Sequence, residues 1–162
     1  MKIRPILKQD REPLAALLRR TDNFTSEEAA VALELIDDSI ERPDSSGYRC
    51  LVALDENGPD GSDYLGYVCY GSTPMTTHTY DLYWIVVDST HRGKHIGRQL
   101  LAAMEGDLQL IGGRIIRVET SSQESYQGTM KFYEKEGFVV AGRIPNFYKD
   151  GDDLLIYIKA LS

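Results

Sequence analysis

Apolar residues along the chain follow two kinds of pattern, which together predict six to seven strands and four helices. Short apolar runs bounded by turn residues indicate strands, whereas apolar residues that recur every three to four positions indicate helices. The clearest helical stripe is Ile96, Leu100, Met104 and Leu108. The predicted strands are 1–6, 48–54, 64–70, 81–87, 114–120, 138–143 and 154–159; the predicted helices follow Asp10 and Thr25 and span 96–111 and 121–136.

Several helix boundaries carry residues that can satisfy free backbone groups. Helices favour a short polar side chain at the N-cap, often with a glutamate three residues later, and a glycine just past the C-terminus. The positions with this pattern are Asp10, Thr25 with Glu28, Ser121 with Glu124, and Gly112–Gly113. We therefore expect three capped helix starts and one left-handed glycine stop.

The order of the predicted elements, β-α-α-β-β-β-α-β-α-β-β, indicates an α+β domain with a mixed sheet. The turn-rich segment 57–61 predicts a hairpin between the strands on either side of it. The strand–helix–strand unit at 81–120 predicts a parallel pair joined by a right-handed crossover. Nothing repeats and no linker interrupts the chain, so residues 1–162 are expected to form a single domain.

Composition narrows the class of protein further. Hydrophobic residues make up 42% and charged residues 27% of the chain, as in ordinary globular domains. No apolar run can span a bilayer and the N-terminus lacks a signal peptide, so we expect a cytoplasmic protein without membrane contact. The net charge of −7 argues against a nucleic-acid partner. Cys50 and Cys69 lie in apolar runs and are interpreted as core residues rather than a disulfide.

The basic segment 92–98 stands out in this acidic chain, because it holds three cations and no acid. It lies between a predicted strand and the start of a helix, where free backbone N–H groups and the helix dipole favour an anion. Gly93 and Gly97 would let the backbone approach a phosphate. The spacing is neither that of a P-loop nor that of a dinucleotide fingerprint. An alternative interpretation is a solvated turn with a basic helix start.

Two segments resemble the signatures of the GNAT acetyltransferases. The strand ending Trp84-Ile85-Val86-Val87-Asp88 is followed by Arg92-x-x-His95-x-Gly97, which is similar to the coenzyme A motif Arg/Gln-x-x-Gly-x-Gly/Ala of that family. Farther on, Phe-Tyr-Glu-Lys-Glu-Gly-Phe at 132–138 resembles the second signature of the family. The resemblance implies a mixed, mostly antiparallel sheet flanked by four helices.

The resemblance also implies acetyl-coenzyme A as co-substrate. Backbone amides of 92–98 would hold its pyrophosphate, and the edge of the strand at 81–87 would hydrogen-bond its pantetheine as an added strand. The residues implied for coenzyme A binding are Ile85, Val86, Val87, Arg92, Gly93, Lys94, His95, Ile96, Gly97, Arg98 and Tyr126.

Two of these positions depart from the family pattern. His95 replaces the first motif glycine: its amide could still reach phosphate from a helical first turn, but a Cβ is costly if the position requires a positive φ. Tyr126 stands where the family often has asparagine, and its hydroxyl could replace the amide contact with pantetheine.

Acetyl transfer to an amine requires a base, because an alkyl ammonium must lose a proton before it attacks, and an acid for the departing thiolate. The resemblance implies Tyr133 as the acid; the alternative is a packed aromatic residue. Asp81, expected to be partly desolvated among aromatic neighbours, is the first candidate for the base, followed by Glu119 and a water chain. The N–H of Ile85 is expected to hold the oxyanion.

These observations predict an acetyl-CoA-dependent N-acetyltransferase that acts through a ternary complex, with a catalytically silent acyl-CoA-binding domain as the alternative. The acceptor, a small-molecule or protein amine, is expected to bind between 21–26 and 145–153, where Asn146, Phe147, Tyr148, Asp150, Asp152 and Asp153 lie. His91 and His95 lack a third ligand, so no metal is expected. Family members are frequently dimers, and a homodimer stays open.

Overall fold

The computed structural model of the chain describes residues 1–21, 24–58 and 63–162. Its strands are β1 (Lys2–Pro5), β2 (Tyr48–Asp55), β3 (Asp63–Ser72), β4 (Thr79–Val87), β5 (Ile115–Ser121), β6 (Val139–Lys149) and β7 (Asp152–Ala160). Its α-helices are α1 (Arg11–Arg19), α2 (Ser26–Glu41), α3 (Ile96–Leu110) and α4 (Gln127–Lys135). The predicted order of elements is confirmed.

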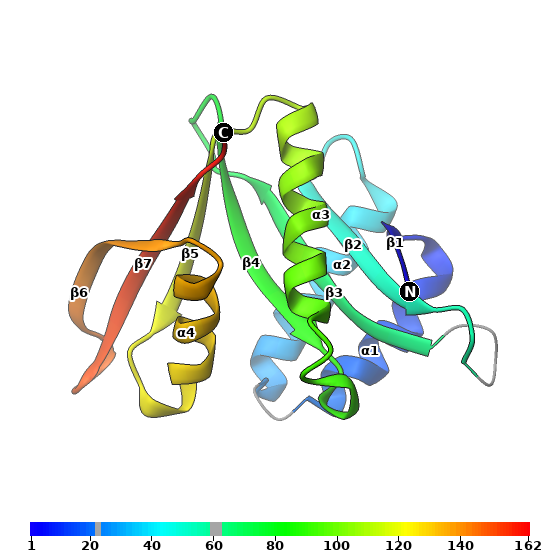
Figure 1. Ribbon diagram of the computed structural model, residues 1–162, viewed down its shortest axis with the longest axis horizontal. Helices are drawn as coiled ribbons and strands as arrows, with labels where there is room; N and C mark the ends of the chain where they lie inside the picture. The colour runs from blue at the N-terminus through cyan, green and yellow to red at the C-terminus, as the bar shows by residue number, and fades with distance from the viewer. Residues whose placement is uncertain (22–23, 59–62) are drawn as a thin grey trace.

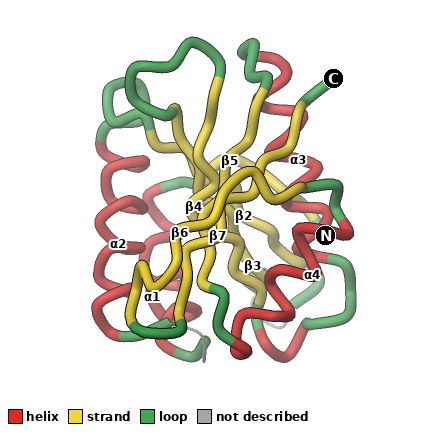
Figure 2. The backbone as a smooth tube through the Cα atoms, turned by 90° about the vertical axis from the view of Figure 1, so that its left-hand side faces the viewer, coloured by secondary structure: helices red, strands yellow, loops and turns green. Residues whose placement is uncertain are grey.

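The seven strands form one mixed sheet in the order β1-β2-β3-β4-β5-β7-β6. Only β4 and β5 pair in parallel; the other neighbours are antiparallel, including the predicted β2–β3 hairpin. Helices cover both faces, with α1 and α2 on one side and α3 and α4 on the other (Figures 1 and 2). The expected α+β fold, a mostly antiparallel sheet flanked by four helices, is confirmed.

Each face of the sheet has its own apolar core, set by the helical stripe that packs on it. The stripe Ile96, Leu100, Met104 and Leu108 of α3 is buried against one face. Leu14, Leu17 and Leu18 of α1 are buried with α2 against the other face. In α3 the helical spacing in the sequence therefore correctly predicted which side chains are buried.

The sheet opens between β4 and β5. These strands pair at only three positions, Thr79 with Ile115, Tyr80 with Ile116 and Asp81 with Arg117. Beyond this point β5 continues with β7 on its other side, while β4 continues with β3, and the two strands separate (Figure 1). The register between β3 and β4 also shifts at Tyr83, which lies between the paired residues Leu82 and Trp84 as a bulge does.

Two of the predicted helix caps are wrong. The Asp10 side chain does not cap α1; its carboxylate is buried and accepts hydrogen bonds from Leu7 N, Tyr64 Oη and the Arg4 guanidinium. Ser121 ends β5, where its hydroxyl donates to Asp152 of β7, and a 3-10 turn separates it from α4. The Asp10 carboxylate is bound by its near neighbours Leu7 and Arg4 together with the distant Tyr64, and the Ser121 hydroxyl is bound by the distant Asp152.

Other boundaries agree with the sequence pattern. The capping box of Thr25 and Glu28 is present in both directions, and Gly112 has the left-handed φ of +85° expected after a helix. The predicted hairpin turn at 57–61 lies partly outside the described residues. Strand β6 runs on to Lys149 instead of ending before a loop, because Pro145 is tolerated on an edge strand, where no further strand needs its missing N–H.

Cys50 and Cys69 face each other across β2 and β3, and both are free thiols in the core. Their exposed fractions are 3% and 0%. The interpretation of both as core residues is confirmed. Within the described residues, no helix has the length and apolar character to cross a membrane.

Candidate active site

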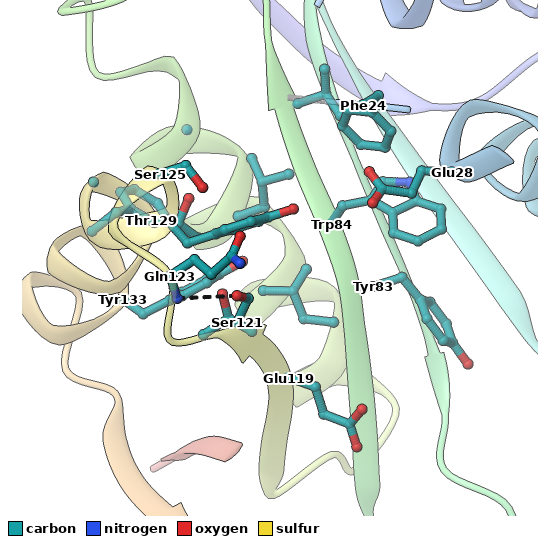
Figure 3. Close-up of a pocket in the computed structure, with 18 of the residues that line it drawn as sticks. Phe24, Glu28, Tyr83, Trp84, Glu119, Ser121, Gln123, Ser125, Thr129 and Tyr133 are labelled. Carbon is teal, nitrogen blue, oxygen red and sulfur yellow. Dashed lines mark hydrogen bonds between the residues drawn. The ribbon is translucent and has the colours of Figure 1, made fainter. Parts of the chain in front are cut away.

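The separation of β4 and β5 opens a cleft with a volume of about 1230 Å³. It is lined from β4, from the start of α3, from the end of β5 and α4, from the segment before α2, and from the β6–β7 hairpin. Figure 3 shows Ser121, Gln123, Ser125, Thr129 and Tyr133 on one wall and Phe24, Glu28, Tyr83 and Trp84 on the other. The cleft therefore brings together residues from both halves of the chain.

The predicted coenzyme A residues divide into two groups. Those that line the cleft are Ile85, Val86, Val87, Arg92, Gly93, Gly97 and Tyr126. Lys94, His95, Ile96 and Arg98 are not among the lining residues: the Ile96 side chain is in the core, and Arg98 Nε lies 3.8 Å from Glu136. These four residues would contribute to coenzyme A binding through their backbone groups or through long-range charge.

His95 adopts the left-handed conformation, with φ of +59°, directly before α3. Gly93 also has a positive φ, +83°. The loop therefore keeps the backbone shape that a glycine would allow at position 95. Histidine is among the non-glycine residues enriched in this region, and the exposed ring meets no core packing.

The carboxylate of Asp88 stabilises this loop, a role that the sequence analysis did not predict. The buried carboxylate accepts hydrogen bonds from Thr90 N and Oγ1 at 2.9 and 2.7 Å, and from Arg20 Nη2 at 2.6 Å. Burial alone would raise the pKa of Asp88, but the bonds from Thr90 and Arg20 outweigh it and lower the pKa to about 2. The only available signal was a short acidic residue two positions before a threonine, directly after a strand.

The aromatic ring of Tyr133 is packed in the core, and the residue also lines the cleft. Its ring contacts Phe138, with centroids 5.3 Å apart, and the residue is only 5% exposed. Among the described residues its hydroxyl has no hydrogen-bond partner, yet the residue lines the cleft. Burial raises the pKa of the phenol well above its ordinary value of 10, so it keeps its proton at neutral pH.

Asp81 has a partner that the sequence did not reveal. Arg117, opposite it in the parallel register, donates from Nε to Asp81 Oδ1 at 2.7 Å. Arg117 Nη1 also lies 3.7 Å from Glu119 Oε1. The first and second candidates for the base therefore share one guanidinium, whose pKa is raised chiefly by its bond to Asp81.

Part of the rest of the lining forms a set that we call the acidic half of the cleft. It consists of Thr21, Phe24, Glu28, Asp81, Tyr83, Trp84, Arg117, Glu119, Tyr148, Lys149 and Asp152. From the two predicted acceptor segments, Thr21, Phe24, Tyr148, Lys149 and Asp152 line it; Asn146, Phe147, Asp150 and Asp153 do not, and residues 22–23 lie outside the described part. Asp153 is instead bound to Arg143, at 2.5 Å.

Residues 46–140 match the acetyltransferase (GNAT) domain. The chain belongs to the GNAT family of acetyltransferases. Comparison with curated protein sequences gave no match. In the part of this GNAT chain that the structure describes, no group of three or more His, Cys, Asp or Glu residues could hold a metal ion.

Solved structures agree with this assignment. A crystal structure from Desulfovibrio desulfuricans, assigned to the GNAT family, is 38% identical, covers 99% of each chain and has a TM-score of 0.93. An aminoglycoside 6'-N-acetyltransferase complexed with coenzyme A is 19% identical, with a TM-score of 0.75 over 100% of this chain and 98% of that one. The ribosomal-protein-S18-alanine N-acetyltransferase from Escherichia coli is 19% identical, with a TM-score of 0.75 over 99% and 94%. The last two show that the GNAT fold is shared.

Proposed function

We propose that this GNAT protein transfers an acetyl group from acetyl-CoA to a primary amine by direct attack in a ternary complex, and that residues 1–162 form one catalytic domain. The observation that carries the proposal is the cleft itself. It begins at a basic loop before a helix, follows an unpaired strand edge, and passes a buried phenol that lines its wall.

The residues present fit acetyl-CoA. Past Asp81 the β4 edge that faces β5 makes no sheet pairs, so backbone groups of Ile85 and Val87 are free to pair with an extended pantetheine arm. The amides of 92–98 would hold the pyrophosphate, helped by two left-handed residues and the start of α3. Tyr126 lines the same cleft and could contact the arm. A related fold has been solved with coenzyme A bound.

The bound thioester would supply an activated acetyl group, and the chain would supply the proton transfers. Tyr133 would donate its proton to the sulfur that leaves, because the phenol is protonated at neutral pH. Burial raises the pKa of this phenol, which makes it a weaker acid than a solvated tyrosine. The N–H of Ile85, next to the bulge in β4, would stabilise the oxyanion. Asp81 would accept the proton of the incoming ammonium directly or through water, with Glu119 as the alternative across Arg117.

The test is an incubation of protein and acetyl-CoA with a panel of primary amines, with free thiol measured over time and the acetylated product identified by mass spectrometry. We expect thiol release that depends on both protein and amine. A protein that binds acetyl-CoA by calorimetry but releases no thiol with any amine would be the silent binding domain, and the proposal would be wrong. The glycine-like backbone at His95 supports coenzyme A binding, which the enzyme and the silent binding domain both require, so thiol release is the measurement that separates them.

A further inference from the structure

Four carboxylates from four different elements enter the acidic half of the cleft. They are Glu28 of α2, Asp81 of β4, Glu119 of β5 and Asp152 of β7. Two cations, Arg117 and Lys149, accompany them. Since the carboxylates come from separate elements, the fold and not a local run of acidic sequence collects them. Figure 3 shows Glu28 on the same wall as Trp84, and Glu119 extending from β5 on the other side of the opening.

Internal contacts leave much of this negative charge unmatched. Arg117 is shared between Asp81 and Glu119, so one guanidinium faces two carboxylates. Asp152 accepts a hydrogen bond from the neutral Ser121 hydroxyl. Glu28 accepts only the backbone N–H of Thr25, at 3.3 Å, among the described residues. A bound cation would therefore find carboxylates that no side chain of the described protein neutralises.

Two tyrosines of the cleft lie within the field of these carboxylates. Burial, and then the charges of Glu119, Asp152 and Glu28, raise the pKa of Tyr148 above its ordinary value. Burial, and then Glu28 and Asp152, do the same for the pKa of Tyr126. Both phenols line the cleft, so negative charge from α2, β5 and β7 meets over the same opening.

Two further observations point to a ligand here, independently of the acids. The Tyr133 hydroxyl is in the same cleft, on a side chain 5% exposed and without a partner in the described protein. On the same wall as Glu28, Phe24 and Trp84 stack edge to face, with centroids 5.9 Å apart. The Trp84 N–H is already used by Tyr67 Oη at 2.8 Å, so this wall offers apolar surface and π electrons, which attract cations.

We infer that the acceptor is a small polycationic amine, in which a second positive charge lies in the acidic half while the first amine is acetylated beside Tyr133. This inference rests on the proposed acetyl transfer to an amine. The second charge would be held by Glu28 at the aromatic wall. An acceptor that carries a carboxylate at the same place would be repelled, because two like charges would meet in a partly desolvated cleft.

The experiment compares three acceptors of equal chain length: a linear diamine, the amino alcohol and the amino acid. We expect kcat/KM for the diamine to exceed that for the amino alcohol by roughly thirty-fold, which corresponds to about 2 kcal/mol. We expect kcat/KM for the amino acid to be lower than that for the amino alcohol. The ratio of diamine to amino alcohol should fall as salt is raised. Equal kcat/KM for the three acceptors would overturn the inference while leaving the proposed function intact; thiol release from none of them, with acetyl-CoA bound, would overturn the function.

A matched pair of variants locates the second charge. Glu28→Gln removes the charge but keeps the capping box with Thr25, because glutamine serves equally in that motif. Glu27→Gln makes the same charge change on the neighbouring exposed residue, which does not line the cleft. We expect Glu28→Gln to lower the diamine to amino alcohol ratio about tenfold, chiefly through the KM of the diamine, and Glu27→Gln to change it less than about twofold. Equal effects of the two variants would overturn the assignment to Glu28.

Discussion

The sequence left two alternatives for Tyr133, a catalytic acid or a packed aromatic residue, and in the structure the two are compatible. The ring belongs to the core under α4, in contact with Phe138 and Tyr157, while the residue also lines the cleft. Packing fixes the ring, so the hydroxyl has little freedom to move away from a substrate. A group held in this way loses little entropy in the reaction, as catalysis by a positioned acid requires.

Tyr133→Phe is expected to lower kcat by roughly 10²–10⁴-fold while the dissociation constant for coenzyme A changes little, because only the proton donor is removed and the ring still packs. Stopped assays of thiol release and calorimetry give the two quantities. The matched control is Tyr157→Phe, which removes another buried hydroxyl, one bound to Glu134 and outside the cleft. Turnover by Tyr133→Phe equal to that of the control would exclude Tyr133 as the acid.

The sequence indicated candidate residues of the site, several of which line the cleft, but not their backbone shapes or partners. The motif located the loop, yet only coordinates show that His95 has a positive φ. Likewise the sequence indicated Asp81 as a candidate base by its position on a strand. It did not predict the ion pair with Arg117, which lies 36 residues away in a strand whose register the sequence does not specify. The aromatic surroundings expected for Asp81 omitted the residue that contacts it most directly.

At the scale of elements, prediction succeeded wherever the determinant was local. The stripe of α3, the Thr25–Glu28 box and the glycine after α3 all depend on neighbours within a few residues. It failed for Ser121, whose hydroxyl donates to Asp152 of β7, and for Asp10, which Tyr64 of β3 holds together with Arg4 and Leu7. The contact between α1 and the loop before α3, through Arg20 and Asp88, is likewise long-range, and no sequence pattern predicts it.

Asp88→Asn tests how strongly this contact holds the loop to α1. The folded pKa of about 2 lies below the ordinary 3.8, so the ionised carboxylate stabilises the fold above the ordinary pKa, and this is lost as pH falls toward 2. We expect the variant to be less stable by about 2 kcal/mol at pH 7. Denaturant unfolding between pH 7 and pH 3 should show the difference narrowing below about pH 4; a difference independent of pH would contradict the assigned ionic role.

At the scale of the whole molecule, the fold class and element order followed from the sequence, and the family resemblance implied a free edge on the strand that became β4. The three pairs between β4 and β5 join the two parts of the sheet, and helices cover each face. A ligand that pairs with β4 would bridge the gap that these strands leave. The electrostatic character of the opening required coordinates, because its carboxylates are scattered along the chain.

Coenzyme A at 100 times its dissociation constant is expected to stabilise the protein by about 2.7 kcal/mol, which for a chain of this size raises Tm by roughly 5–10 °C. Thermal unfolding at increasing concentrations measures this. Pantetheine, which keeps the arm but lacks the pyrophosphate, is the comparison, and it should shift Tm much less at equal concentration if the loop at 92–98 holds the diphosphate. Identical shifts would remove that role from the loop.

The burial of Cys50 and Cys69 has a practical consequence for enzymology. Both sulfur atoms lie inside the sheet–helix core, so a chromogenic disulfide reagent added to native protein has no route to them. The colour that develops during turnover would then come from the thiol of released coenzyme A, with no background from the thiols of the protein. In guanidinium the same reagent would titrate two sulfhydryls per chain, so one cuvette method serves both as a rate assay and as a count of denatured molecules.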